Sequence, residues 1–290
     1  MLLSLNTDPA AGSADDLNEI TMEKGNMCEI FGITADRKIR ANEVLIEFFS
    51  HSSEHRDGWG LAGFDDGYPA VEKEPVTARD SVYLRARLAG ELSAAHMMAH
   101  IRRATCGTQE YDNTHPFVKQ DASGRMWTLV HNGHIFDAPE LRRYLSTQSG
   151  STDSERILCY IVDEVSRQPG RAAATGGAGS DGSRRIQTIE RITRELSPGN
   201  KLNFILYDGE LMYVHTNEPG GLYFRSGSGS KTFSTRPLAA AGVSGWEELA
   251  PNRLHVYKDA DEIYSGDPHG FTYIRDPEKE QELYINYSFL

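Results

Sequence analysis

Cys28 is the residue of this sequence that could most clearly act as a nucleophile. It follows Met27 and opens the apolar run CEIFGIT. In a chain beginning at Cys28, one residue would carry both a thiol, with an ordinary pKa of about 8.5, and an α-amine, with a pKa of about 7.7 to 8.0. Such an amine can serve as the base that activates its own side chain. The alternative is a small residue buried in a strand, a common place for a free cysteine.

Two further segments combine polar groups with apolar surroundings. Arg102 and Arg103 lie within a predicted strand, AHIRRAT, where a buried guanidinium needs an anionic partner such as a substrate carboxylate. The alternative is a pair of surface arginines whose aliphatic side-chain carbons lie along the strand.

In LVHNGHIF, the Asn132 amide and the Gly133 N–H could both face a developing oxyanion. The alternative for Asn-Gly is a type I′ turn.

Asp153 and His115 are weaker candidates. Asp153 in STDSER lies at a predicted helix start, where a carboxylate is usually a cap. His115 precedes a proline in NTHPF, which predicts a rigid loop, and a lone histidine is more often a packing residue than a catalyst. Neither residue indicates a function alone.

Composition limits the classes of function. The 290 residues carry 30 basic and 42 acidic side chains, a formal charge of −12, which argues against a nucleic-acid binder. We find no apolar run of the roughly 20 residues that cross a bilayer and no secretory signal pattern, so we expect no membrane association and a cytoplasmic location. The three cysteines are far apart, which predicts neither a disulfide framework nor a cysteine-based zinc site.

The elements that must position these residues come in blocks of strands and blocks of helices. This order favours an α+β fold with antiparallel sheets over a doubly wound parallel one. Strands are predicted at 28–34, 58–68, 94–105, 126–136, 201–217, 220–226, 231–238 and 252–258, with a hairpin at Asp208-Gly209. Helices are predicted at 41–53, 81–92, 138–145, 151–168 and 186–196. The Gly/Ala/Ser-rich segment 169–183 predicts a flexible loop, either a disordered insertion or a docking element.

Six motifs in this order resemble the class II glutamine amidotransferases, and among them the stand-alone, YafJ-like branch. They are MCEIFGI, HRDGWGLAGF, AHIRRATCG, NTHPF, TLVHNGHIFD and TDSE, and the likeness continues through KLNFILYDGELMYVHTN and TFSTRPL. The resemblance implies the N-terminal nucleophile (Ntn) hydrolase fold, a four-layer αββα sandwich with antiparallel sheets.

The resemblance also implies roles for seven residues. The catalytic set is Cys28 as nucleophile with Asn132 and Gly133 as the oxyanion hole. The substrate-binding set is Arg102 for the α-carboxylate of glutamine, Asp153 for its α-ammonium group, Thr105 from the same pattern as Arg102, and His115 from the His-Pro loop. No metal and no organic cofactor is implied.

Three functions remain open on the sequence. The first is a glutamine amidohydrolase that releases ammonia and glutamate, for a separate acceptor enzyme or as a free hydrolase. The second is a γ-glutamyl hydrolase acting on an amide or conjugate, as in ergothioneine biosynthesis, and the third is a non-catalytic glutamine-binding module. We expect residues 27–290 to form one amidotransferase domain. Residues 1–26 are then a leader that is disordered, and either processed or the product of a misassigned start.

Overall fold

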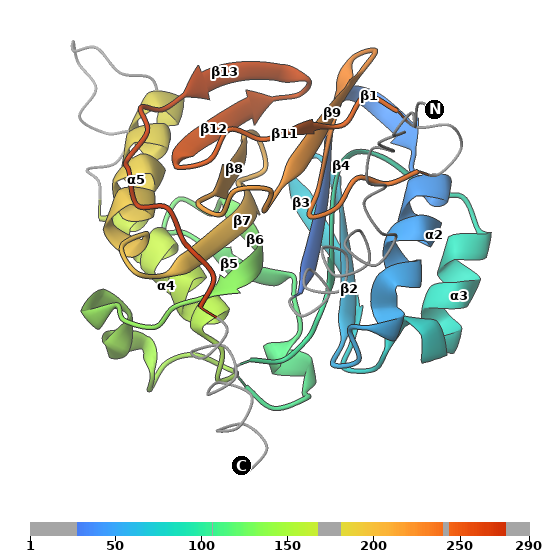
Figure 1. Ribbon diagram of the computed structural model, residues 1–290, viewed down its shortest axis with the longest axis horizontal. Helices are drawn as coiled ribbons and strands as arrows, with labels where there is room; N and C mark the ends of the chain where they lie inside the picture. Colours follow the sequence, from blue (N-terminus) through green and yellow to red (C-terminus); the bar gives the residue numbers. More distant parts are fainter. Residues whose placement is uncertain (1–27, 106, 168–180, 240–243, 277–290) are drawn as a thin grey trace, which may run out of the picture.

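The strands form two antiparallel sheets that lie face to face, with helices on both outer faces (Figure 1). The computed structural model describes residues 28–105, 107–167, 181–239 and 244–276. This arrangement is the four-layer αββα sandwich that the family resemblance implies, and it confirms the α+β fold class with antiparallel sheets. The predicted leader, 1–26, lies outside the described residues, as does most of the predicted loop at 169–183. No helix in the described part of the chain is long and apolar enough to cross a membrane.

The first sheet contains the strand that follows Cys28. Its strand order is β11-β9-β10-β1-β4-β2-β3. In chain order these strands are β1 (Glu29–Arg40), β2 (Trp59–Asp65), β3 (Tyr68–Glu74), β4 (Ser93–Ile101), β9 (Tyr223–Gly227), β10 (Ser230–Ser234) and β11 (Glu247–Glu248). Because β1 lies between β4 and β10, residues just beyond the ends of those two strands are the neighbours of Cys28.

The second sheet contains Asn132 and Gly133. Its strand order is β13-β12-β8-β7-β6-β5. In chain order these strands are β5 (Phe117–Gln120), β6 (Met126–His134), β7 (Lys201–Tyr207), β8 (Met212–Thr216), β12 (Arg253–Lys258) and β13 (Asp261–Ser265). The predicted hairpin is confirmed: β7 and β8 are joined through Asp208 and Gly209, and Gly209 has a φ of 86°.

Two helices cover each sheet. The first sheet is covered by α2 (Asn42–Ser50) and α3 (Val82–Ala89), and the second by α4 (Asp153–Ser166) and α5 (Asp181–Leu196) (Figure 1). Short 3₁₀ turns are η2 (His51–Ser53), η3 (Ala78–Asp80), η4 (Tyr111–Asn113) and η5 (Pro139–Tyr144). Two predictions need correction. The helix predicted at 138–145 is the 3₁₀ turn η5, and 181–183 of the predicted loop are the first residues of α5.

Three apolar cores hold the four layers together. One lies between α2–α3 and the first sheet and another between α4–α5 and the second. The third joins the sheets and includes Ile30, Val130 and Ile205. At Gly32 a Cβ atom would lie 2.9 Å from the Cδ1 of Ile205, so glycine permits the close approach of the sheets. Each strand that carries a candidate residue is therefore fixed on two faces.

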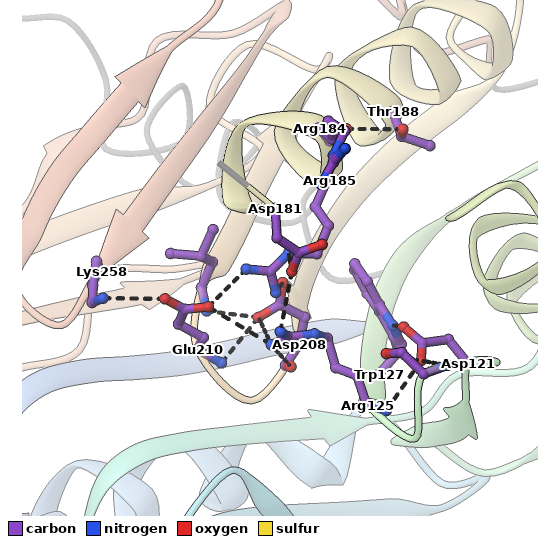
Figure 2. Close-up of polar contacts among 12 residues, drawn as sticks. Asp121, Arg125, Trp127, Asp181, Arg184, Arg185, Thr188, Asp208, Glu210 and Lys258 are labelled. Carbon is purple, nitrogen blue, oxygen red and sulfur yellow. Dashed lines mark hydrogen bonds and ion pairs between the residues drawn. The ribbon is translucent and has the colours of Figure 1, made fainter. Parts of the chain in front are cut away.

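A buried ion pair ties α5 to the β7–β8 hairpin (Figure 2). Nη1 of Arg185 lies 2.7 Å from Oδ2 of Asp208, and both side chains are buried. Oδ2 of Asp208 also accepts a hydrogen bond from the Tyr213 hydroxyl, and Nη2 of Arg185 contacts Glu210 at 2.7 Å. These charges border a cleft of about 980 Å³ formed by hairpin turns at the ends of the strands opposite Cys28.

Breaking this pair from one side should destabilise the protein strongly. We expect Arg185→Met to lower the free energy of unfolding by about 3–5 kcal/mol, because the buried Asp208 carboxylate then keeps only its longer contact to a cation, with Nη1 of Arg125 3.8 Å from its Oδ1. Urea denaturation measures the change. Arg142→Met is the control: Arg142 forms an exposed pair with Asp137, and its loss should cost less than about 1 kcal/mol. Equal effects of the two substitutions would contradict this account of the pair.

Candidate active site

Cys28 lies immediately before β1 and is half-buried. The antiparallel pairing of Glu29 with Ile101 sets it opposite the residues that follow β4. The thiol donates to the Arg103 carbonyl at 3.2 Å and accepts from the Arg103 N–H at 3.3 Å. Burial raises the pKa of the Cys28 thiol, although the Arg103 backbone and the Arg102 charge oppose that shift. The sulfur is therefore a neutral thiol near pH 7, and it needs a base to become a nucleophile.

Arg102 lies just beyond β4, which ends at Ile101, so the prediction that it lies within the strand is wrong. Its buried guanidinium donates to three carbonyl oxygens, those of Gly107 at 2.6 Å, Thr108 at 3.0 Å and Asp57 at 3.4 Å. These contacts hold the side chain in one position. Thr105 is also buried, three residues further along the same turn.

Asp57 fixes this turn from the side of β2. Its Oδ2 accepts from the Ala104 N–H at 2.7 Å, and its backbone N–H donates to the Arg102 carbonyl at 3.0 Å. The Arg102 N–H in turn donates to the Gly58 carbonyl at 2.8 Å. Residues 57 and 58 thus form a short loop that leads into β2 and holds the turn at 102–105.

Asn132 and Gly133 lie inside β6, so the alternative prediction of a turn is wrong. They pair with Asn203 and Leu202 of β7. A Cβ atom on Gly133 would lie 2.1 Å from the Lys201 carbonyl oxygen and 2.4 Å from Nε2 of His131, which leaves room only for glycine. Nδ2 of Asn132 donates to the Thr235 hydroxyl at 3.4 Å, and its Oδ1 is buried with no hydrogen-bond partner in the described part of the chain.

Thr235 joins the two sheets at the candidate site, and the sequence analysis assigned it no role. It follows β10. Its hydroxyl accepts from the Ile30 N–H at 3.0 Å as well as from Asn132, and its own N–H donates to the Ile30 carbonyl at 3.0 Å. One hydroxyl thus connects the residue two positions after Cys28 with the Asn132 amide. The motif TFSTRPL was the available signal, but only the fold brings it beside β1.

Asp153 is the first residue of α4, and the cap of this helix is Thr152, whose hydroxyl accepts from the Glu155 N–H. The Asp153 carboxylate accepts from the N–H groups of Ile135 and Ser154, both at 2.8 Å. Burial alone would raise the pKa of Asp153, but the His134 and His131 rings and the Ile135 N–H outweigh it and hold that pKa below its usual range. Asp153 is therefore an anion anchored to the segment that follows Gly133.

His115 is buried and packs against other aromatic side chains. Its buried ring stacks on that of His100 in β4, with centroids 4.0 Å apart, and meets the Phe117 ring edge to face. Burial, next to other imidazoles, lowers the pKa of His115 well below its usual range, so the ring is neutral. These contacts match the packing alternative, and the prediction that His115 binds substrate stays a prediction.

Short chains of contacts connect five of the seven predicted residues. The sulfur of Cys28 is hydrogen-bonded to the backbone of Arg103, which follows Arg102. Thr235 links Ile30 to Asn132. Two residues after Gly133, the Ile135 N–H holds the Asp153 carboxylate. In the described part of the chain, no group of three or more histidine, cysteine, aspartate or glutamate side chains could hold a metal ion. The arrangement combines a thiol, an amide donor, a cation and an anion, which suits acyl chemistry on a zwitterionic substrate.

The four-layer sandwich, with a cysteine at the start of a strand in one sheet and an Asn-Gly pair within a strand of the other, defines the Ntn hydrolase class. A family model for class II glutamine amidotransferases matches residues 27–225. The chain therefore belongs to the class II glutamine amidotransferases.

Two relatives illustrate this membership. The chain is 31% identical over 142 residues to an uncharacterised protein of Methanocaldococcus jannaschii, an alignment that covers 49% of this chain and 40% of that protein. It is 27% identical over 200 residues to YafJ of Escherichia coli (strain K12), covering 66% of this chain and 74% of YafJ. The chain thus spans less than two thirds of the M. jannaschii protein.

Solved structures agree on the fold. A Bacillus subtilis glutamine phosphoribosylpyrophosphate amidotransferase superposes with a TM-score of 0.62 at 18% identity, covering 86% of this chain and 50% of that one. A predicted glutamine amidotransferase from Pseudomonas aeruginosa gives a TM-score of 0.54 at 18% identity, covering 82% and 100%. At such identities the likeness concerns the fold alone.

The close packing of Gly133 gives a direct test of the geometry of β6. We expect Gly133→Ala to destabilise or unfold the protein, because the new methyl group would collide with the backbone of β7. Gly63→Ala in β2 is the matched control, since a Cβ atom there meets nothing within 4 Å. Thermal unfolding compares the two variants. A Gly133→Ala protein as stable as Gly63→Ala would show that β6 lies elsewhere.

Proposed function

We propose that this protein hydrolyses the side-chain amide of glutamine, with Cys28 as the nucleophile, and releases ammonia and glutamate. The observation that carries the proposal is the Thr235 hydroxyl, which joins the start of β1, beside the cysteine, to the Asn132 amide in the other sheet. Family membership supports glutamine as the substrate, and the positions of Arg102 and Asp153 support recognition of a free amino acid.

The chemistry begins with removal of the thiol proton. Because burial raises the pKa of the Cys28 thiol, it requires a base, and its own α-amine supplies one once the preceding residues are gone. The thiolate attacks the γ-carbonyl carbon, and the resulting oxyanion is stabilised by Nδ2–H of Asn132 and the N–H of Gly133. The carbon–nitrogen bond breaks as the protonated amine returns its proton, and ammonia leaves. Water then hydrolyses the γ-glutamyl thioester to give glutamate and free thiol.

Two charges select the substrate. The Arg102 guanidinium, held by three carbonyl oxygens, binds the α-carboxylate of glutamine, and the Asp153 carboxylate binds its α-ammonium group. We place Thr105 in the same pocket wall. A simple amide lacks both charges, so binding it would remove water from the pocket without forming either ion pair with the substrate.

The N-terminal position of Cys28 can be tested by mass. We expect the active protein, expressed from its native gene, to begin at Cys28 by intact-mass measurement. Cys28→Ala should abolish ammonia release while retaining glutamine binding. Cys159→Ala, which removes a thiol buried in α4, should leave activity unchanged. A fully active protein that retains Met27, or an active Cys28→Ala variant, would contradict the proposal.

Asn132 provides the test of the oxyanion hole. We expect Asn132→Ala to lower kcat by about 10²–10³ with little change in KM, because the lost donor acts mainly in the transition state. The control is Asn203→Ala, since Asn203 is the buried partner of Asn132 in β7 but donates to Glu218 instead. That variant should lose stability and keep its kcat. Equal losses of kcat in both variants would show a general structural effect.

The same assays separate the two other hypotheses. A γ-glutamyl hydrolase would turn over γ-glutamyl amides or conjugates with a higher kcat/KM than glutamine. A non-catalytic glutamine-binding module would bind glutamine without releasing ammonia, and Cys28 would resist 6-diazo-5-oxo-norleucine, a glutamine-shaped electrophile. Ammonia release that rises on addition of a second protein would identify a separate acceptor enzyme.

A further inference from the structure

Glu29, the residue after the nucleophile, has a carboxylate that is almost fully buried, with 1% of the residue exposed. An ionised carboxylate in the interior requires partners of opposite charge. Arg236 Nε lies 3.0 Å from Oε1 in an ion pair, His51 Nδ1 lies 2.9 Å from Oε2, and His55 Nε2 lies 3.8 Å from Oε1. The side chain of Glu29 is thus fixed from two directions, by η2 with the loop after it and by the loop after β10.

The partners of Glu29 continue the connection that Thr235 makes. Arg236 directly follows Thr235, so one dipeptide holds two consecutive residues of β1: Arg236 binds the Glu29 side chain and Thr235 binds the Ile30 backbone. Thr235 also holds Asn132. The first two residues after Cys28 are therefore attached to the same loop that touches the oxyanion donor.

This attachment matters because the proposed enzyme has Cys28 at its chain terminus. Terminal residues are mobile unless side-chain or backbone contacts hold them. The Cys28 sulfur forms two hydrogen bonds to the Arg103 backbone, both longer than 3 Å. The nearest charged anchor along the chain is Glu29.

We propose that Glu29 is a positioning residue for the reaction: its ion pairs with Arg236 and His51 fix the start of β1 and so set the direction of the Cys28 thiol and amine toward Asn132. The inference rests on the proposed function for its effect on turnover. A displacement of about 1 Å at a reacting group can lower the rate by about 10²-fold. Removing one partner of a buried ion pair also costs stability, so the rate must be compared well below the melting temperature of each variant.

The test compares three variants that begin at Cys28. Glu29→Gln keeps the size of the side chain and removes its charge, Glu29→Asp keeps the charge and shortens the reach, and Arg236→Gln removes the partner without altering β1. We expect each to lower kcat for glutamine by about 10- to 100-fold with KM within about threefold of the wild-type value. The double variant Glu29→Gln/Arg236→Gln should be no slower than the slower single variant, because both act through one contact.

Glu54→Gln is the matched control. Glu54 is half-exposed and binds the other end of the same arginine, with its Oε2 3.1 Å from Nη2 of Arg236. Its loss should leave kcat unchanged. If the Glu29 and Arg236 variants keep wild-type kcat while their melting temperatures fall, Glu29 is only structural and the proposal is overturned. If Glu29→Gln does not fold, the kcat and melting temperature of Arg236→Gln decide whether Glu29 positions Cys28 or is only structural.

A second readout separates failure of this inference from failure of the proposed function. The rate at which iodoacetamide alkylates Cys28, followed by peptide mass mapping, does not require glutamine turnover. If the wild-type protein releases no ammonia from glutamine, the proposed function fails, and alkylation then tests positioning alone. A slower reaction in Glu29→Asp, which keeps the charge, supports the inference, and a rate equal to wild type overturns it.

Discussion

The candidate site depends on the contact between two sheets. Cys28 precedes a strand of the first sheet, while Asn132 and Gly133 belong to a strand of the second. No local segment of sequence can bring these groups together. The interlayer core sets the separation of the sheets, and the Thr235 hydroxyl joins them at the end where the chemistry is proposed. Any change that slides one sheet over the other would separate Cys28 from Asn132 while leaving each strand intact.

The electrostatics of the site follow from the same architecture. The thiol lies where burial disfavours its ionised form, so a nearby base is required. The two charges proposed to bind substrate are held differently: Arg102 by carbonyl oxygens, and Asp153 by backbone N–H groups and histidine rings. Such a site suits a substrate that carries one positive and one negative group.

Much of this was predictable from sequence, for identifiable reasons. The helix containing Leu45 and Phe48 and the hairpin at Asp208-Gly209 follow from local periodicity and turn chemistry, which need no distant partner. The chemistry of Asn132-Gly133 was one of two alternatives, because Asn-Gly also forms tight turns. Pairing with β7 decides that it lies in a strand. Thr235, Arg236 and Glu29 had no predicted role, since the contact between Thr235 and Ile30 joins positions 205 residues apart and Arg236 reaches Glu29 only through the same pairing.

The most direct test of the account is a crystal structure of the protein that begins at Cys28 after reaction with 6-diazo-5-oxo-norleucine. We expect one covalent adduct, on the Cys28 sulfur, with its carbonyl oxygen about 2.7–3.1 Å from Nδ2 of Asn132 and the N–H of Gly133. Its α-carboxylate should contact Arg102 and its α-ammonium group Asp153. An adduct whose oxygen points away from β6, or no adduct at Cys28, would contradict the claim that contact between the sheets builds an amide-hydrolysing site.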